Sequence, residues 1–134
     1  MRKIVPLMVL ALLSTGAAPP LMHTCTPGPY IVFFDWSSSA LKKQAVEILD
    51  NAVQNEGDCG PMTVVLAGHT DTSEPATLSR QRLKAVSNYF ASRGIFVKRR
   101  NVLDYGARQQ RVATAKGVNE PRNRRVEIIY GPGL

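Results

Sequence analysis

The sequence predicts an α/β fold, a two-layer sandwich of a mixed four-stranded sheet with two long helices on one face (β-α-β-α-β-β). Runs of β-branched and other apolar residues alternate with two long segments of helical periodicity. The two resulting strand-helix-strand crossovers favour some parallel pairing. Because the chain supplies only two long helices, we expect them to cover one face of the sheet.

The first predicted strand is residues 30–34, which are β-branched and aromatic. Residues 35–39 break it and offer serine hydroxyls that could cap a helix. The first helix is predicted over about residues 40–55, and Gly57 with the Gly60-Pro61 pair ends it. Its apolar residues repeat at helical spacing: Leu41, Ala45, Ile48, Leu49, Ala52 and Val53.

The second predicted strand covers about residues 62–67. The second helix is expected to begin near residues 73–75, where Ser73 can cap it and Pro75 suits its first turn. This helix should end before Gly94.

The C-terminal third of the domain is predicted to hold two more strands. The third strand lies near residues 101–105, and the polar stretch 106–123 is expected to be a loop with a short helical turn. The last strand is residues 124–130, and residues 131–134 form a tail.

The N-terminus is typical of a secretory signal, predicted over residues 1–18. Two basic residues precede the apolar run 4–13, and small residues at 15–18 suit cleavage. The run is shorter than the roughly 20 residues that span a membrane, so we expect no transmembrane segment in the mature chain. An uncleaved interfacial anchor and lipidation at Cys25 are the alternatives, although residues 22–24 lack the pattern that lipoprotein processing needs.

Charge and length leave one modestly basic domain. The chain has 134 residues and a net charge of +7, and loss of Arg2 and Lys3 with the signal leaves +5. This bias favours anionic partners without identifying one. The export signal argues against nucleic acid.

The two cysteines, Cys25 and Cys59, both belong to the mature chain. Cys25 lies in an N-terminal segment, residues 19–28, ahead of the predicted domain. In an oxidising compartment an even pair suggests one disulfide, which would join this segment to the turn after the first helix. No other Cys or His shares a ligand spacing with them, so no metal site is predicted. His69, directly after Gly68, is interpreted as structural.

The motif Gly68-His69-Thr70-Asp71 follows an apolar strand and places Asp71 at its end. Arg82 lies on the apolar stripe of the next helix, four residues from both Leu78 and Val86. A charge on a core-facing stripe needs a partner. Asp71 and Arg82 could therefore recognise a ligand that carries an ammonium and a carboxylate. The alternative is a buried salt bridge between them that only ties helix to strand.

These pieces, with Phe34-Asp35, Leu78-Ser79, Tyr105-Gly106 and the segment 123–127 (Asn-Arg-Arg-Val-Glu), stand in an order that resembles a known family. The stretch 29–130 is similar to the OmpA-like C-terminal, peptidoglycan-associated domains. The resemblance implies non-covalent binding of the peptidoglycan stem peptide, no enzymatic activity and no cofactor. It also implies a periplasmic place, in association with the outer membrane or cell wall.

Residue by residue, the resemblance implies that Asp71 receives the ammonium of the diaminopimelate side chain and Arg82 its carboxylate. Backbone N–H groups of Thr70 and Ser37 would assist. Either Arg124 or Arg125 would add positive charge at the rim, and only one can face the pocket because neighbours alternate across a strand.

One departure from the family pattern lies between Asp71 and Arg82, which are eleven residues apart. The segment is shorter than the family's by about one helical turn, and it carries a second acid, Glu74, which could engage Arg82 itself. An alternative hypothesis is therefore an OmpA-like fold with a degenerate pocket. Such a module would act structurally or bind envelope proteins, through Trp36, Tyr105 and the basic last strand.

Overall fold

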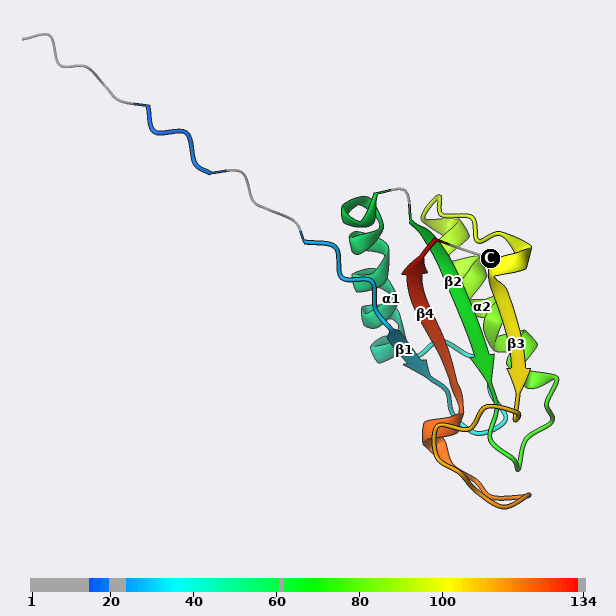
Figure 1. The fold of residues 1–134 in the computed structure, drawn as a ribbon. Coiled ribbons are helices and arrows are strands. Elements are labelled where there is room, and N and C mark those ends of the chain that lie inside the picture. Colours follow the sequence, from blue (N-terminus) through cyan, green and yellow to red (C-terminus); the bar gives the residue numbers. More distant parts are fainter. Residues whose placement is uncertain (1–14, 20–23, 61, 133–134) are drawn as a thin grey trace, which may run out of the picture.

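The structure is a computed structural model that describes residues 15–19, 24–60 and 62–132. It contains four strands and two long helices in the predicted order (Figure 1). The elements are β1 (Tyr30–Phe33), α1 (Lys43–Glu56), β2 (Thr63–His69), α2 (Leu78–Ser92), β3 (Val102–Gly106) and β4 (Arg125–Gly131). Short 3₁₀ turns are η1 (Gly57–Cys59), η2 (Arg99–Asn101) and η3 (Pro121–Asn123).

The sheet has the strand order β1-β4-β2-β3. β4 runs antiparallel to both of its neighbours, and β3 runs parallel to β2. The crossover from β2 through α2 to β3 accounts for the parallel pair. α1 and α2 lie on the same side of the sheet (Figure 1). The predicted mixed four-stranded sheet with two helices on one face is confirmed.

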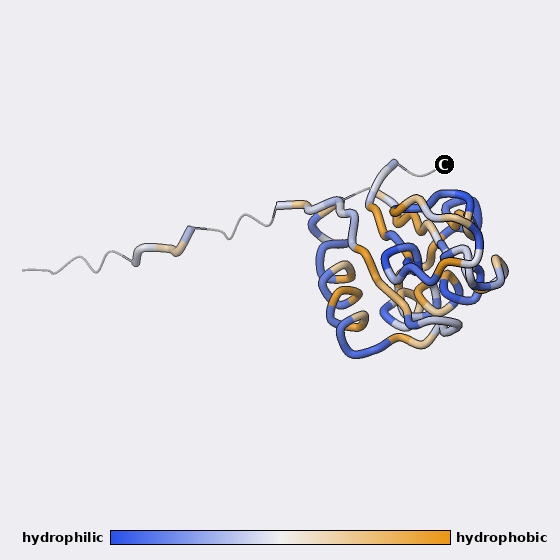
Figure 2. The backbone as a smooth tube through the Cα atoms, turned by 90° about the horizontal axis from the view of Figure 1, so that it is seen from below, coloured by the Kyte–Doolittle hydropathy of each residue, from blue (hydrophilic) through white to orange (hydrophobic). Residues whose placement is uncertain are grey.

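The core lies between the sheet and the helices. In β4, Val126, Ile128 and Tyr130 alternate with residues of the opposite face and are almost fully buried. Each helix turns its apolar stripe toward the sheet and its polar residues outward (Figure 2). The helices contribute the buried residues Ala45, Leu49, Ala52, Leu83, Val86 and Phe90.

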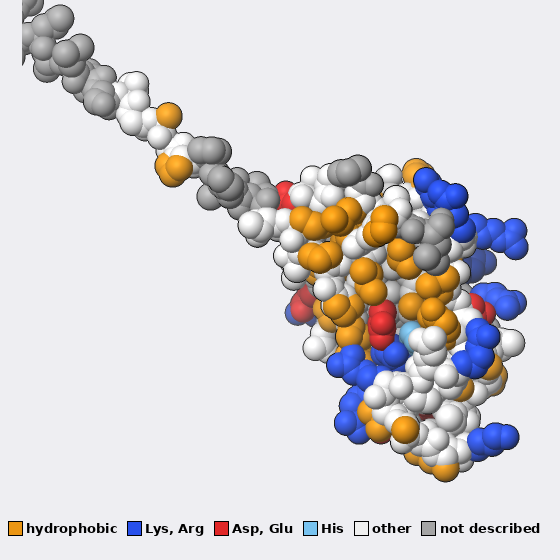
Figure 3. All heavy atoms as spheres, in the orientation of Figure 1, with side chains coloured by type: hydrophobic (Ala, Val, Ile, Leu, Met, Phe, Trp, Pro, Cys, Tyr) orange, Lys and Arg blue, Asp and Glu red, His pale blue; other side chains and the backbone are white. Residues whose placement is uncertain are grey.

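In the part of the chain that the structure describes, no helix covers the other face of the sheet. Phe33 and Ile129 are exposed on this face. The ion pair between Arg125 and Glu127, on β4, lies on the same face. Figure 3 looks onto this face and shows hydrophobic side chains over the strands, interrupted by charged ones.

Gly68 allows α2 to pack closely on the end of β2. A Cβ atom at this position would lie 2.5 Å from Cγ of Leu83 and 3.0 Å from the carbonyl oxygen of Ser79. The absence of a side chain therefore brings the first turns of α2, including Arg82, next to the segment that follows β2.

Both helices begin later than the sequence indicated. α1 begins at Lys43, and its N-cap residue, Lys42, makes no side-chain cap. The preceding serines form a turn instead, in which Ser37 has a φ of 55° and the Ser38 hydroxyl accepts the N–H of Ala40 at 3.1 Å. In this segment the Ser38 hydroxyl bonds a nearby backbone N–H and does not cap the helix.

α2 begins at Leu78, so Ser73 and Pro75 lie in the connection before it. The Asp71 carboxylate accepts the N–H groups of Ser73 at 2.9 Å and Glu74 at 3.1 Å. An Asp that captures the N–H groups two and three residues on forms a turn, which delays the helix.

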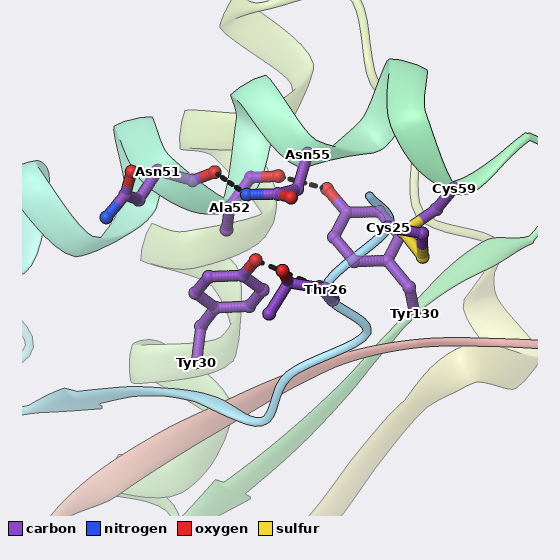
Figure 4. The surroundings of a disulfide bond; sticks show 8 residues. All are labelled: Cys25, Thr26, Tyr30, Asn51, Ala52, Asn55, Cys59 and Tyr130. Carbon is purple, nitrogen blue, oxygen red and sulfur yellow. Dashed lines mark hydrogen bonds between the residues drawn. A yellow bond between two sulfur atoms is a disulfide. The ribbon is translucent and has the colours of Figure 1, made fainter. Parts of the chain in front are cut away.

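A disulfide joins Cys25, ahead of β1, to Cys59 in η1 (Figure 4). The predicted pairing is therefore present in the structure. Two tyrosines pack beside it, and the hydroxyl of Tyr130 donates to the carbonyl of Ala52 on α1 while that of Tyr30 donates to Thr26. The disulfide fixes the N-terminal segment to the turn after α1, the Tyr30 bond holds that segment to β1, and the Tyr130 bond ties β4 to α1.

Within the described ranges, no helix is both long and apolar enough to cross a membrane. Most of the predicted signal peptide, residues 1–14, lies outside those ranges.

Candidate functional site

The carboxyl ends of β1, β2 and β3 meet the start of β4 at one edge of the sheet (Figure 1). The segments that follow β1 and β2 supply Ser37 and Asp71, and the residue just before β4 is Arg124. α2 adds Arg82 from its second turn. Three charged residues predicted for the site therefore gather at this edge.

Arg82 is fully buried and satisfied at every donor. Its Nη2 lies 2.5 Å from Oε1 of Glu74, and its Nη1 lies 2.8 Å from Oε2 of the same carboxylate. Neither side chain of this ion pair has any exposed surface. The remaining three N–H groups donate to the carbonyls of Ser38, His69 and Asp35, at 2.9, 3.2 and 3.1 Å.

Glu74 accepts two backbone N–H groups in addition to the guanidinium of Arg82. The N–H of Ser37 donates to Oε1 at 2.8 Å, and that of Asp71 donates to Oε2 at 3.3 Å. A bidentate guanidinium with two backbone donors is a complete carboxylate-binding site. In this structure it is filled by a carboxylate of the chain itself.

Asp71 is likewise fully buried and paired. Its Oδ1 accepts from the N–H and hydroxyl of Ser73 and from the N–H of Glu74, at 2.9, 2.8 and 3.1 Å. Its Oδ2 accepts from Nη1 of Arg124 and the N–H of Glu120, each at 3.1 Å. Burial raises the pKa of this carboxyl, but the hydrogen bonds from Ser73, Arg124 and Glu120 outweigh burial and lower it overall.

Of the two adjacent arginines, Arg124 is the one that faces Asp71. Its Nε donates to the carbonyl of Phe34 at 3.0 Å, and its Nη1 also reaches the side chain of Asn119. Arg125 points to the opposite face of the sheet, where its Nε donates to Glu127 at 2.7 Å.

The direct Asp71–Arg82 salt bridge that the sequence left open does not form between these described side chains. Arg82 pairs with Glu74, and Asp71 pairs with Arg124. Glu74 was recognisable in the sequence as a second acid within the short segment.

Two other hydrogen bonds of the site were not predicted from the sequence. The N–H of Thr70, which we expected to face the ligand, donates in this structure to the carbonyl of Gly106 at 2.9 Å, just past the end of β2. The contact from the Glu120 N–H has no signature in the sequence, since any residue supplies a backbone donor.

The segment between Asp71 and α2 closes over both charge pairs. Thr72 is held from one side, where its hydroxyl donates to the carbonyl of Ala115 at 2.6 Å and its carbonyl accepts from Gly117 at 3.1 Å. Ser73 is held from the other side, where its hydroxyl accepts from the indole of Trp36 at 3.0 Å.

A cavity of about 430 Å³ lies beside the site, on the α1 side. Its lining combines apolar side chains with three basic residues and one acidic residue. It is lined by Phe33, Phe34, Asp35, Lys42, Gln44, Ala45, Ile48, Pro121, Arg122 and Arg124. Among the paired charges of the site, Arg124 is the one that reaches this cavity.

The side chain of His69 is buried and packs within the fold. Its ring is buried and stacks on Tyr105, with ring centroids 5.3 Å apart. Burial lowers the pKa of His69 to about 4, and the positive charge of Arg125 adds to this effect while Glu127 opposes it. Within the described residues, no group of three or more His, Cys, Asp or Glu side chains could hold a metal ion.

The comparison with family models identifies one family for most of the chain. A family model, the OmpA family, matches residues 33–124. The chain is 33% identical over 110 residues to an outer membrane protein of Gluconacetobacter diazotrophicus, covering 75% of this chain and 29% of that protein. It is 30% identical over 100 residues to outer membrane protein A of Bordetella avium, covering 72% and 52%. The chain thus spans about half or less of these relatives.

Among solved structures, the chain resembles the peptidoglycan-associated lipoprotein from Burkholderia pseudomallei with a TM-score of 0.61. The match covers 75% of this chain and 89% of that chain, at 19% identity. It also resembles the cell wall anchor of the T6SS from Pseudomonas aeruginosa, with a TM-score of 0.58 at 20% identity over 74% of this chain and 75% of that one. At these identities the likeness establishes a shared fold.

Proposed function

Because the chain belongs to the OmpA family, we propose that it associates with the cell wall by binding peptidoglycan non-covalently. The ligand would be the diaminopimelate residue of the stem peptide. The observation that carries the proposal is the carboxylate-binding site made by Arg82 and the N–H groups of Ser37 and Asp71. The names of the structural relatives, a peptidoglycan-associated lipoprotein and a cell wall anchor, support the same reading.

Diaminopimelate suits this site because its side chain ends in an ammonium and a carboxylate on one carbon. The guanidinium of Arg82 would bind the carboxylate through two parallel hydrogen bonds. Asp71, whose lowered pKa keeps it ionised, would receive the ammonium. Loss of either partner should cost several kcal/mol of binding, partly because the other charge is left unpaired.

In this role the domain carries out no catalytic step and needs no cofactor, because Asp71 and Arg82 only bind the ligand. It places the domain in the periplasm, at the outer membrane or cell wall, after cleavage of residues 1–18. Envelope proteins are further proposed partners, and nucleic acid is not.

A second candidate function is a structural or protein-interaction module with a degenerate pocket. The specific observation in its favour is that Glu74 and Arg124 already neutralise Arg82 and Asp71. Such a module could use the exposed Trp36, of which 55% is accessible, and the open face of the sheet.

Retention on purified peptidoglycan sacculi tests the proposal. We would compare the mature protein with Asp71→Asn and Arg82→Lys, and use Arg125→Gln as the control because Arg125 lies on the other face. Circular dichroism would establish that each variant is folded. We expect retention of the wild type and the control, loss with both site variants, and elution by free meso-diaminopimelate but not by Nα-acetyl-L-lysine amide, whose side chain ends in an ammonium without a carboxylate. A folded wild type that is not retained would favour the second candidate.

A further inference from the structure

Glu74 sits where a ligand's carboxylate would sit. Its two oxygens take the guanidinium of Arg82 and two backbone N–H groups, and no part of its side chain is exposed. By contrast, the residues that flank it lie at the surface: Ser73 is half-buried and Pro75 is exposed. The backbone of this segment therefore runs along the outside of the site and projects a single carboxylate inward.

The same residue also blocks the ammonium position. The N–H of Glu74 donates to Oδ1 of Asp71, together with the N–H and hydroxyl of Ser73. If Ser73 and Glu74 move outward, Oδ1 loses three donors while Arg82 loses its carboxylate. One movement of one segment thus frees both charge positions.

Arg124 would stay in place during this movement. It is bound to the carbonyl of Phe34 at the end of β1 and to Asn119, and it contacts Oδ2 of Asp71 rather than Oδ1. Asp71 would therefore remain ionised and fixed, with Oδ1 turned to the site.

The movable part is short, and its strongest attachments are the bonds that Ser73 and Glu74 make inside the site itself. Thr72 anchors its first end to Ala115 and Gly117, and α2 fixes its other end from Leu78 onward. Outside the site, Ser73 is also held by the hydrogen bond from Trp36, which is exposed to solvent. Exposed hydrogen bonds of this kind contribute little to stability.

We propose that residues 73–75 form a lid that carries its own substitute for the ligand's carboxylate, so that a ligand binds by displacing Glu74. The inference rests on the proposed function for the identity of that ligand. It explains how buried, fully paired charges can still serve as a binding site. It also makes Glu74 a determinant of affinity, because a ligand binds only the open fraction of molecules.

Rescue by a small carboxylate tests the lid without peptidoglycan. We would measure the melting temperature of Glu74→Ala and Glu74→Gln in rising sodium acetate, against sodium chloride of equal ionic strength. Glu47→Ala is the matched control, since Glu47 is an exposed glutamate on α1 paired with Lys43 at 3.6 Å. Acetate should raise the melting temperature of the Glu74 variants by several degrees more than chloride does. The wild type and the control should not respond in this way.

Glu74→Ala leaves Arg82 without its carboxylate and could unfold in chloride. Folding of this variant in acetate would then itself support the proposal. Glu74→Gln keeps an oxygen for Arg82 and provides a folded background for the titration. Equal responses to acetate and chloride in every Glu74 variant would overturn the lid.

Binding to sacculi separates the lid from the proposed function. Removal of Glu74 should lower the half-saturating sacculus concentration on the order of tenfold relative to the wild type, because the internal competitor is gone. If acetate stabilises the Glu74 variants but no form of the protein binds sacculi, the lid stands and the proposed function fails. If the wild type and the Glu74 variants bind sacculi equally and acetate has no effect, the proposed function stands and the lid fails.

Discussion

Glu74 and Arg82 form an ion pair through both carboxylate oxygens, at 2.5 and 2.8 Å, with neither side chain exposed. The pair joins the segment after β2 to α2. Buried pairs of this kind recover the desolvation of two charges only when the remaining donors and acceptors are satisfied. The three carbonyls that accept from Arg82 and the two N–H groups that donate to Glu74 meet that condition.

We therefore expect a strong coupling between these two residues. Glu74→Gln or Arg82→Met alone should lower the free energy of unfolding by about 3–5 kcal/mol, because each leaves the partner's charge buried and unpaired. The double variant should lose at least about 2 kcal/mol less than the sum of the two. Urea unfolding of all four proteins measures the cycle. Additive losses would mean that the pair contributes nothing beyond its separate contacts.

The neighbouring pair of Asp71 and Arg124 gives a second prediction, with Arg125 as its control. Asp71→Asn and Arg124→Gln should show a coupling of about 1–3 kcal/mol in urea unfolding, because their side chains meet in a buried contact at 3.1 Å. Asp71→Asn and Arg125→Gln should be additive to within about 0.5 kcal/mol, since Arg125 pairs with Glu127 on the far face. Coupling of Asp71 to Arg125 instead would contradict this placement of the two arginines.

The disulfide should stabilise the domain substantially. Cys25 and Cys59 close a loop with a sequence separation of 34, which corresponds to about 3–4 kcal/mol in the chain-entropy treatment of the unfolded state. The Cys25→Ala/Cys59→Ala variant should therefore melt well below the oxidised wild type, and reduction of the wild type should lower its melting temperature similarly. A variant with the same melting temperature as the oxidised wild type would show that the disulfide does not stabilise the folded protein.

The order of elements could be predicted because strand and helix periodicities differ clearly in this chain. The helix starts could not, because Asp71 and the serines after β1 hold local turns that compete with capping. Those hydrogen bonds depend on the folded path of the backbone, which residue types alone do not determine.

The site was predictable in its members but not in its pairing. Asp71 and Arg82 stood out because a strand end and a core-facing helix stripe do not normally carry charge. Their partners depend on the folded backbone. Glu74 reaches Arg82 because the segment before α2 is short. Arg124 faces Asp71 because successive side chains of β4 point to opposite faces of the sheet. A shift of one residue in β4 would turn Arg125 instead of Arg124 toward Asp71.

The buried imidazole of His69 predicts how stability depends on pH. Burial lowers its pKa to about 4 in the folded protein, below the ordinary value of about 6.5 expected in the unfolded chain. Between these values the unfolded chain takes up a proton that the folded protein does not. The contribution of His69 is therefore fully present above about pH 6.5 and is lost as the pH falls toward 4, by about 3 kcal/mol. Asp71 adds a loss at still lower pH, because its pKa lies below the ordinary carboxyl range. Urea unfolding from pH 4 to 7 should show this fall in the wild type but not in His69→Phe, which keeps a ring to stack on Tyr105. The control is His23→Gln, which removes the other histidine of the chain and should show the same fall as the wild type. A His69→Phe curve parallel to the wild type would assign the fall to other groups.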